Sequence, residues 1–221
     1  MDAIVEQALM KWPNVPHCYG WLALDARGAW RMHSPQNFPR DAMQSSAPSS
    51  AQRIESPGEK ICHPVLLDFI NRNYTHDEQG CWYFQNGPQR VYIDLEAAPY
   101  IARTQASEAF ILHTGVQMES IATIWLSEQG RLYLQDQNRI ALLDDRDLAQ
   151  CLSCLHVDAS DDGHNPRSVI DDEQLLAWLD APSEDMFLSL QWQGRKIPVK
   201  HILEQEVAAH FGFICLPRRI D

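Results

Sequence analysis

Alternating apolar and polar residues on both sides of short polar turns are the dominant pattern of this chain. Turns of the form Asp/Ser-x-x-Gly occur at 25–28, 77–80 and 127–130, with a looser copy at 191–194. Asp or Ser at the first position and Gly at the fourth suit a type I turn, and a glycine with positive φ can close a hairpin with a bulge. The pattern therefore predicts a series of β-hairpins.

Two of these turns are followed by similar segments. Gly80 precedes an apolar strand, a polar turn and the strand 90–93, while Gly130 precedes the same order of features up to the strand 139–142. The glycines are unequally spaced, which argues against a solenoid because its units keep a fixed period. The interpretation is a duplicated α+β unit in which the Gly80 and Gly130 hairpins correspond.

Helical periodicity and capping residues predict helices between the hairpins. Asp2, Asp144 and Asp171 are suitable N-terminal caps, and Pro64 is tolerated at a first helical position. Gly212 suits a helix C-terminus. The helices are expected at 2–12, from 63 to about 70, at 94–103 on both sides of Pro99, at 144–155, after Asp171, and at 201–210.

The predicted fold class is therefore α+β, with duplicated units of short antiparallel β-meander packed with helices. We expect an N-terminal α+β unit at residues 1–105 and a C-terminal α+β unit at residues 106–221. Residues 34–60 are rich in Ser and Pro and poor in large apolar side chains, so they are expected to form a long loop or linker within the first unit.

The composition of the chain excludes some classes of binding partner and of cellular location. The chain has 221 residues, a net charge of −12 and only 18 Lys plus Arg. Because phosphate neutralisation dominates nucleic-acid binding, no nucleic-acid partner is expected. The sequence has no apolar run of membrane-spanning length and no secretion signal, so no membrane association is expected and the predicted location is cytoplasmic. The six cysteines are expected to stay reduced there.

No metal or cofactor is expected. Cys151 and Cys154 have C-x-x-C spacing, but a zinc site needs about four ligands and no second pair is present. Within the predicted helix, the two cysteines are interpreted as small apolar core residues. Residues 158–169 partly match a calcium-binding loop, but Val169 stands where the bidentate Glu is required.

Seven tryptophans suggest a different kind of site. Aromatic side chains on a sheet face can form a groove for a peptide or small molecule, and an arginine can anchor an anionic group there. The competing interpretation is that the rings form the core of short strands. The candidate ligand-binding residues are Trp21, Trp30, His63, Trp82, Arg90 and Tyr92.

Two longer segments carry a resemblance to known sequences. Residues 11–25 with Gly28 and Trp30, containing W-P-N-V-P and Y-G-W, resemble an uncharacterised proteobacterial protein family, and so do residues 81–99, containing F-Q-N-G-P-Q-R-V-Y. This family is a domain of unknown function and supplies no catalytic residues. A second uncharacterised bacterial family is similar more distantly, and it implies repeated α+β motifs and a role in signalling.

The sequence favours a non-enzymatic ligand- or protein-binding or regulatory module, with signalling as its setting and an unknown small molecule or protein as its partner. No familiar catalytic signature is present. The alternative is an enzyme with a dispersed active site around His63, Asp68 and Cys81. A third hypothesis is a homo-oligomer joined through an edge strand.

Overall fold

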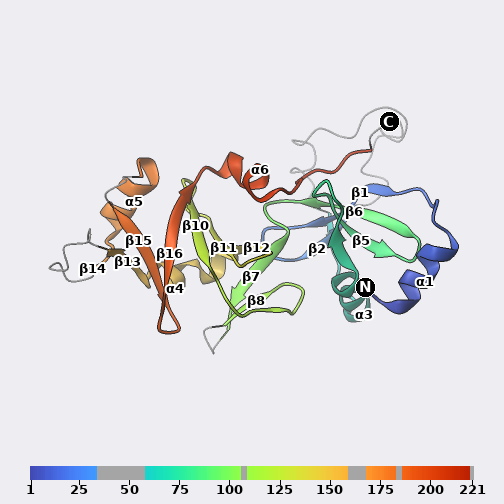
Figure 1. The fold of residues 1–221 in the computed structure, drawn as a ribbon, viewed down its shortest axis with the longest axis horizontal. Helices are drawn as coiled ribbons and strands as arrows, with labels where there is room; N and C mark the ends of the chain where they lie inside the picture. Colours follow the sequence, from blue (N-terminus) through green and yellow to red (C-terminus); the bar gives the residue numbers. More distant parts are fainter. Residues whose placement is uncertain (34–57, 106–108, 159–167, 183–185, 220–221) are drawn as a thin grey trace. The chain divides into compact units, whose positions relative to one another are not determined.

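The chain forms two compact units, each with its own β-sheet (Figure 1). The computed structural model describes residues 1–33, 58–105, 109–158, 168–182 and 186–219. Unit 1 contains residues 1–99 and 211–221, and unit 2 contains residues 100–210. The sequence-based division after residue 105 assigned all later residues to the second unit, whereas this division places the C-terminal segment with unit 1.

Unit 1 is built on a six-stranded sheet with the order β3-β2-β1-β6-β5-β4. Buried and more exposed side chains alternate in the second half of β1, where Leu22 and Leu24 are buried and contribute to the core with Trp30, Ile70 and Ile93. The elements are α1 (Ala3–Lys11), β1 (Cys18–Leu24), β2 (Trp30–Met32), β3 (Glu59–Lys60), α3 (Pro64–Arg72), β4 (Tyr74–His76), β5 (Trp82–Asn86) and β6 (Gln89–Leu95).

Unit 2 is built on a ten-stranded sheet with the order β14-β13-β15-β16-β10-β11-β12-β7-β8-β9. Its first elements are β7 (Tyr100–Thr104), β8 (Phe110–Leu112), β9 (Gln117–Met118), β10 (Thr123–Ser127), β11 (Leu132–Gln135), β12 (Ile140–Leu143) and α4 (Leu148–Leu152). The others are β13 (Leu155–Asp158), β14 (Ser168–Val169), α5 (Asp172–Asp180), β15 (Phe187–Trp192), β16 (Arg195–Ile202) and α6 (Val207–Phe211). Throughout the described ranges, the helices are too short or too polar to cross a membrane.

The two sheets contain the same strand pairings in the same register. In unit 1, β1 pairs antiparallel with β2 and parallel with β6, and β6 forms a hairpin with β5. In unit 2, β10 pairs in the same way with β11 and β16, and β16 forms a hairpin with β15. The corresponding pairs include Leu22–Ile93 with Ile124–Val199, and Tyr83–Tyr92 with Ser189–Pro198.

This topology corrects the predicted correspondence between hairpins. Gly28 closes the β1–β2 hairpin and Gly130 closes the equivalent β10–β11 hairpin, whereas Gly80 lies between β4 and β5. The similar sequences after Gly80 and Gly130 therefore reflect the common pattern of a hairpin, not the same position in the unit. In unit 2, the β14 strand and helix α5 are inserted between β13 and β15, where unit 1 has the short turn that contains Gly80.

Several predicted elements differ from the structure. The helix expected at 94–103 is absent, because β6 continues to Leu95 and Tyr100 begins β7, where Ile101 and Ala102 are buried by pairing with two neighbouring strands. Local helix propensity is thus overridden by sheet pairing. The last helix begins at Val207 instead of residue 201, because β16 extends to Ile202.

Two predicted caps are confirmed. Asp171 forms a capping box with Gln174 at the start of α5. The Asp144 side chain accepts a hydrogen bond from the backbone N–H of Arg146, but the helix that follows ends at Leu152 and not at Leu155. The Ser/Pro-rich segment and the calcium-like loop fall mostly on residues 34–57 and 159–167, which lie outside the described residues.

Asp144 also anchors a network of ion pairs in unit 2. Its side chain is fully buried, pairs with the Arg146 guanidinium and lies 3.8 Å from Arg103 Nε. Burial alone would raise the pKa of Asp144, but hydrogen bonds from Arg146 lower it to about 2. Asp144 therefore needs to be ionised for this network to form.

This lowered pKa predicts an acid-sensitive contribution to stability. Because the folded pKa is below the value of 3.8 for an ordinary Asp, the contribution is complete above about pH 5 and is lost as pH falls from about 4 to 2. It amounts to roughly 2 kcal/mol. Urea unfolding at several pH values should show Asp144→Asn to be less stable than the wild type at pH 7, with the difference vanishing near pH 2. A difference that does not change with pH would contradict this account.

Candidate functional site

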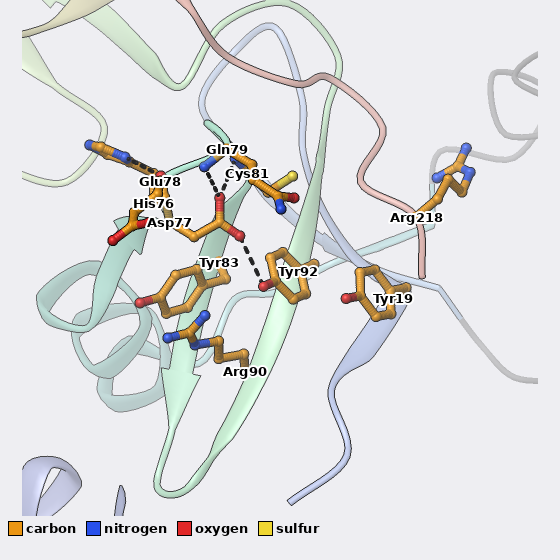
Figure 2. A pocket seen from close by; sticks show the side chains of 10 residues that line it. All are labelled: Tyr19, His76, Asp77, Glu78, Gln79, Cys81, Tyr83, Arg90, Tyr92 and Arg218. Carbon is orange, nitrogen blue, oxygen red and sulfur yellow. Dashed lines mark hydrogen bonds between the residues drawn. The ribbon is translucent and has the colours of Figure 1, made fainter. Parts of the chain in front are cut away.

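A pocket of about 670 Å³ opens on unit 1 where the β4–β5 turn meets strands β1, β5 and β6 (Figure 2). This volume is within the range of roughly 300–1,000 Å³ that is typical of small-molecule sites. The pocket is lined by Tyr19, His76, Asp77, Glu78, Gln79, Cys81, Tyr83, Arg90, Tyr92 and Arg218.

Strand pairing brings the aromatic lining residues together. Tyr83 of β5 lies directly opposite Tyr92 of β6, and the two-residue turn at 87–88 fixes this register. Arg90 is two residues before Tyr92, so both side chains point to the same face of the sheet. Tyr19 comes from β1, which pairs with the other side of β6.

Three tyrosines, Tyr19, Tyr83 and Tyr92, form what we call the tyrosine shelf. The Tyr19 and Tyr92 rings are stacked with centroids 4.6 Å apart and an angle of 6° between their planes. Tyr83 meets Tyr92 edge-on at 5.6 Å. These are favourable geometries for aromatic pairs, so the shelf is a defined apolar surface.

Asp77 fixes the turn that forms one wall of the pocket. Its Oδ1 accepts backbone hydrogen bonds from Gln79 (3.0 Å) and Cys81 (2.9 Å), and its Oδ2 accepts the Tyr92 hydroxyl hydrogen at 3.0 Å (Figure 2). Burial, together with the neighbouring Asp77, raises the pKa of Tyr92 to about 12. The Tyr92 hydroxyl therefore stays protonated and keeps donating to Asp77.

Arg90 supplies positive charge beside the shelf. Its guanidinium lies over the Tyr83 ring, 4.6 Å from the centroid. Burial alone would lower the pKa of Arg90, but interaction with Tyr92, Tyr83 and Asp77 raises it. Within the described part of the chain, Arg90 forms no ion pair with a carboxylate. Its charge is thus held by aromatic rings and remains available to an anion.

The C-terminal strap, residues 212–218, borders the same pocket. The backbone N–H of Ile214 donates to Gly80 O at 3.0 Å, and Cys215 O accepts from Leu95 N at 2.7 Å. Gly80 has φ +81°, and a Cβ at this position would lie 2.1 Å from Gly212 O. Only glycine allows the turn and the strap to approach this closely.

The structure brings together two of the six predicted site residues, Arg90 and Tyr92. Trp82 does not line the pocket but packs against one of its lining residues, His76, at a centroid distance of 4.9 Å. Trp21 is on β1 with 39% of its surface exposed, outside the pocket.

The other two candidates have different positions. Trp30 is 2% exposed and belongs to the core, where its Nε1–H donates to Asn71 Oδ1 at 2.8 Å. His63 is exposed and precedes α3 as its N-terminal cap residue. The core interpretation of aromatic residues therefore describes Trp30, whereas the shelf tyrosines line the pocket.

The residues of the alternative enzyme hypothesis lie on different elements. His63 and Asp68 are exposed at the start and in the middle of α3, whereas Cys81 is buried in the pocket. Burial and the charge of Asp77 raise the pKa of Cys81, which disfavours the reactive thiolate. Of these three residues, the pocket contains Cys81 alone.

Cys151 of the C-x-x-C pair lies in α4 and packs into the core of unit 2. Burial raises the pKa of this thiol to about 12, so it behaves as a small apolar residue. Among residues whose placement is described, no three His, Cys, Asp or Glu side chains are grouped as metal ligands.

Four residues that define the pocket, Tyr19, Asp77, Tyr83 and Arg218, were not among the candidates predicted from the sequence. Tyr19 precedes the alternation of β1, in which Leu22 and Leu24 face the core, and this position could have placed it on the opposite face. Asp77 opens an Asp-x-x-Gly turn. This motif predicts the turn, but it does not predict that the turn forms a wall of the pocket. Arg218 is far from the other residues in sequence, and no local signal connects it with them.

Comparison with known proteins identifies a family for this chain but no activity. Among solved structures, a DUF1285 family protein from Silicibacter pomeroyi DSS-3 is similar at 14% sequence identity with a TM-score of 0.44, covering 93% of this chain and 99% of that chain. No curated protein shows a significant match. Residues 1–218 match the model of family DUF2944, described as "Protein of unknown function (DUF2946)". The chain therefore belongs to this family of proteins of unknown function.

Proposed function

We propose that unit 1 is a non-enzymatic binding module for a small planar anion. The observation that carries this proposal is the position of Arg90, whose guanidinium lies over Tyr83 beside the stacked Tyr19 and Tyr92 rings. The rings offer a surface for a planar group, and the guanidinium offers a fork of donors to a carboxylate or phosphate. A ligand with both features would use both parts of the pocket.

Local charge supports an anionic ligand. The protein carries a net charge of −12, so its overall field does not attract anions. In the pocket, the Asp77 carboxylate accepts three hydrogen bonds, whereas Arg90 forms no ion pair with a carboxylate of the described residues and can donate to a ligand. A partly buried guanidinium binds an anion more strongly than an exposed one, because water screens the interaction less.

The same contacts favour binding over catalysis. Asp77 is engaged in holding the turn. Tyr92 is held protonated and Cys81 has a raised pKa, so these two groups are poorly suited to exchange protons near neutral pH. We therefore rank the binding module ahead of an enzyme. A regulatory role in the reducing cytoplasm, with the anion as the signal, is the setting we propose, and it is compatible with six cysteines that form no disulfide with one another.

Unit 2 supports a stoichiometry of one ligand per chain. The register equivalence puts Ser189, Lys196 and Pro198 at the positions of Tyr83, Arg90 and Tyr92. Two of the three shelf tyrosines and the planar guanidinium thus have no counterpart of the same kind. Lys196 can attract an anion as a point charge but cannot bind it with a planar fork.

The proposal predicts that Arg90→Gln weakens binding of 2-naphthoate about tenfold or more, because a charge-assisted contact typically contributes about 1.5–3 kcal/mol. NMR titration of the labelled full chain with this probe reports affinity and location, through the backbone N–H signals of Gln79 and Cys81. The neutral isostere 2-naphthamide should bind wild type and Arg90→Gln equally weakly.

Lys196→Gln is the matched control, since it removes a positive charge from the equivalent position in unit 2. It should leave the affinity for 2-naphthoate within about twofold, because Lys196 does not line the pocket. If both charge-removing variants weaken binding equally, or if the amide binds as well as the acid, the anion-binding function is wrong.

A further inference from the structure

We propose that the ligand of this pocket is a planar dianion, whose second anionic group is bound by Arg218 of the C-terminal strap. This inference rests on the proposed function and specifies its ligand class. Arg218 lines the same pocket as Arg90, although the two residues are far apart in sequence. The Arg218 side chain is 35% exposed, so a ligand bound in the pocket can reach it.

The strap holds Arg218 in a defined position. Phe213 and Pro217 are buried on either side of the hydrogen bonds made by Ile214 and Cys215. The Arg218 guanidinium donates from Nη1 to Pro217 O at 2.9 Å and lies 3.7 Å from Asp94 Oδ1. A guanidinium has five N–H donors, so an incoming anionic group can be bound while these contacts persist.

Positive charge flanks the tyrosine shelf at both ends. Figure 2 shows Arg90 beneath Tyr83, then Tyr92 and Tyr19, and Arg218 beyond Tyr19.

This arrangement selects for the shape and the charge of the ligand together. A flat body can lie along the shelf, while anionic groups at its two ends meet Arg90 and Arg218. Two planar guanidinium forks at separate places favour two carboxylates or phosphates over one compact anion. The chemical class is therefore an extended aromatic or conjugated dicarboxylate, or its phosphate equivalent.

The test uses three probes with one ring system: 2-naphthamide, 2-naphthoate and 2,6-naphthalenedicarboxylate, with charges of zero, −1 and −2. We expect the dicarboxylate to bind the wild-type full chain about tenfold more tightly than the monoacid, the equivalent of one charge-assisted contact. Arg218→Gln should remove this preference, so that this variant binds the dicarboxylate and 2-naphthoate with equal affinity. Arg218→Lys should restore part of the preference, and Lys196→Gln should preserve it.

The outcomes separate the two proposals. If 2-naphthoate binds through Arg90 but the dicarboxylate binds no more tightly, or if its preference survives in Arg218→Gln, the dianion inference is wrong and the binding function stands. If neither acid shifts the pocket signals at millimolar concentration, both proposals are wrong. Unchanged backbone N–H signals of Ile214 and Leu95 in Arg218→Gln would show that the strap is still docked in that variant.

Discussion

Replacing Trp30 with alanine is expected to lower the free energy of unfolding of unit 1 by about 3–5 kcal/mol, the usual effect of truncating a buried aromatic side chain. Trp30 is 2% exposed, meets Tyr74 edge-on at 5.1 Å and donates a hydrogen bond to Asn71. The substitution leaves a cavity and removes the partner of the Asn71 side chain. Urea unfolding followed by far-UV circular dichroism measures the loss.

Trp21→Ala is the matched control, because Trp21 lies on the neighbouring strand β1 with 39% of its surface exposed. Its truncation should lower stability by less than about 1 kcal/mol. Comparable losses for both tryptophans would contradict the division into a core ring and a surface ring. Since neither tryptophan lines the pocket, affinity for 2-naphthoate should not change in Trp21→Ala.

Gly80→Ala is expected to release the C-terminal strap and destabilise unit 1 by about 3–5 kcal/mol, through backbone strain, lost hydrogen bonds and exposure of Phe213. The added Cβ would lie 2.1 Å from Gly212 O, which is a backbone atom and cannot rotate away. The hydrogen bonds from Ile214 to Gly80 and from Leu95 to Cys215 should break. Hydrogen exchange of the Ile214 and Leu95 N–H groups detects this loss directly.

Gly87→Ala separates the contact from the backbone strain. Gly87 belongs to the same unit and also has a positive φ of +58°, but an added Cβ would meet only Ala8 Cβ, at 4.0 Å. This variant should be destabilised by about 1 kcal/mol with normal protection of Ile214. Equal losses of stability and protection in the two variants would mean that contact with the strap is not the cause.

The local features of the fold could be predicted from the sequence. The turn chemistry of 25–28 and 127–130 identifies two hairpins, and Asp171 identifies the start of α5, because these signals act within a few residues. The parallel pairing of β1 with β6 and of β10 with β16 could not be predicted in this way. It joins residues about seventy positions apart, and nothing in a local window records such a partner.

Residues 94–103 illustrate the limit of local reasoning. The residue types of this segment, including Leu95, Ala97 and Ala98, suit a helix. Instead, the segment ends β6 and leads into β7, because β7 can pair with both β12 and β8. The assignment of Gly80 to the same position as Gly130 failed for a related reason. Hairpins of similar sequence occur at different places in one topology, and only the register of their partners tells them apart.

The candidate site was predictable in part. Arg90 and Tyr92 were both candidates, and they lie two residues apart on β6, so they share one face of the sheet. Trp30 is an aromatic residue that could line a groove, but it occupies a core position of β2. The residue type alone therefore could not decide between a core and a groove position. Arg218 reaches the pocket because the chain returns to unit 1 after completing unit 2, which is a property of the tertiary fold.

The most direct test of the central claim is a crystal structure of the full chain with 2-naphthoate at saturating concentration. The account predicts the naphthalene ring against the tyrosine shelf of unit 1, with the carboxylate within hydrogen-bond distance of the Arg90 guanidinium. Naphthoate bound elsewhere, with Arg90 still over Tyr83 and the shelf bare, would contradict it.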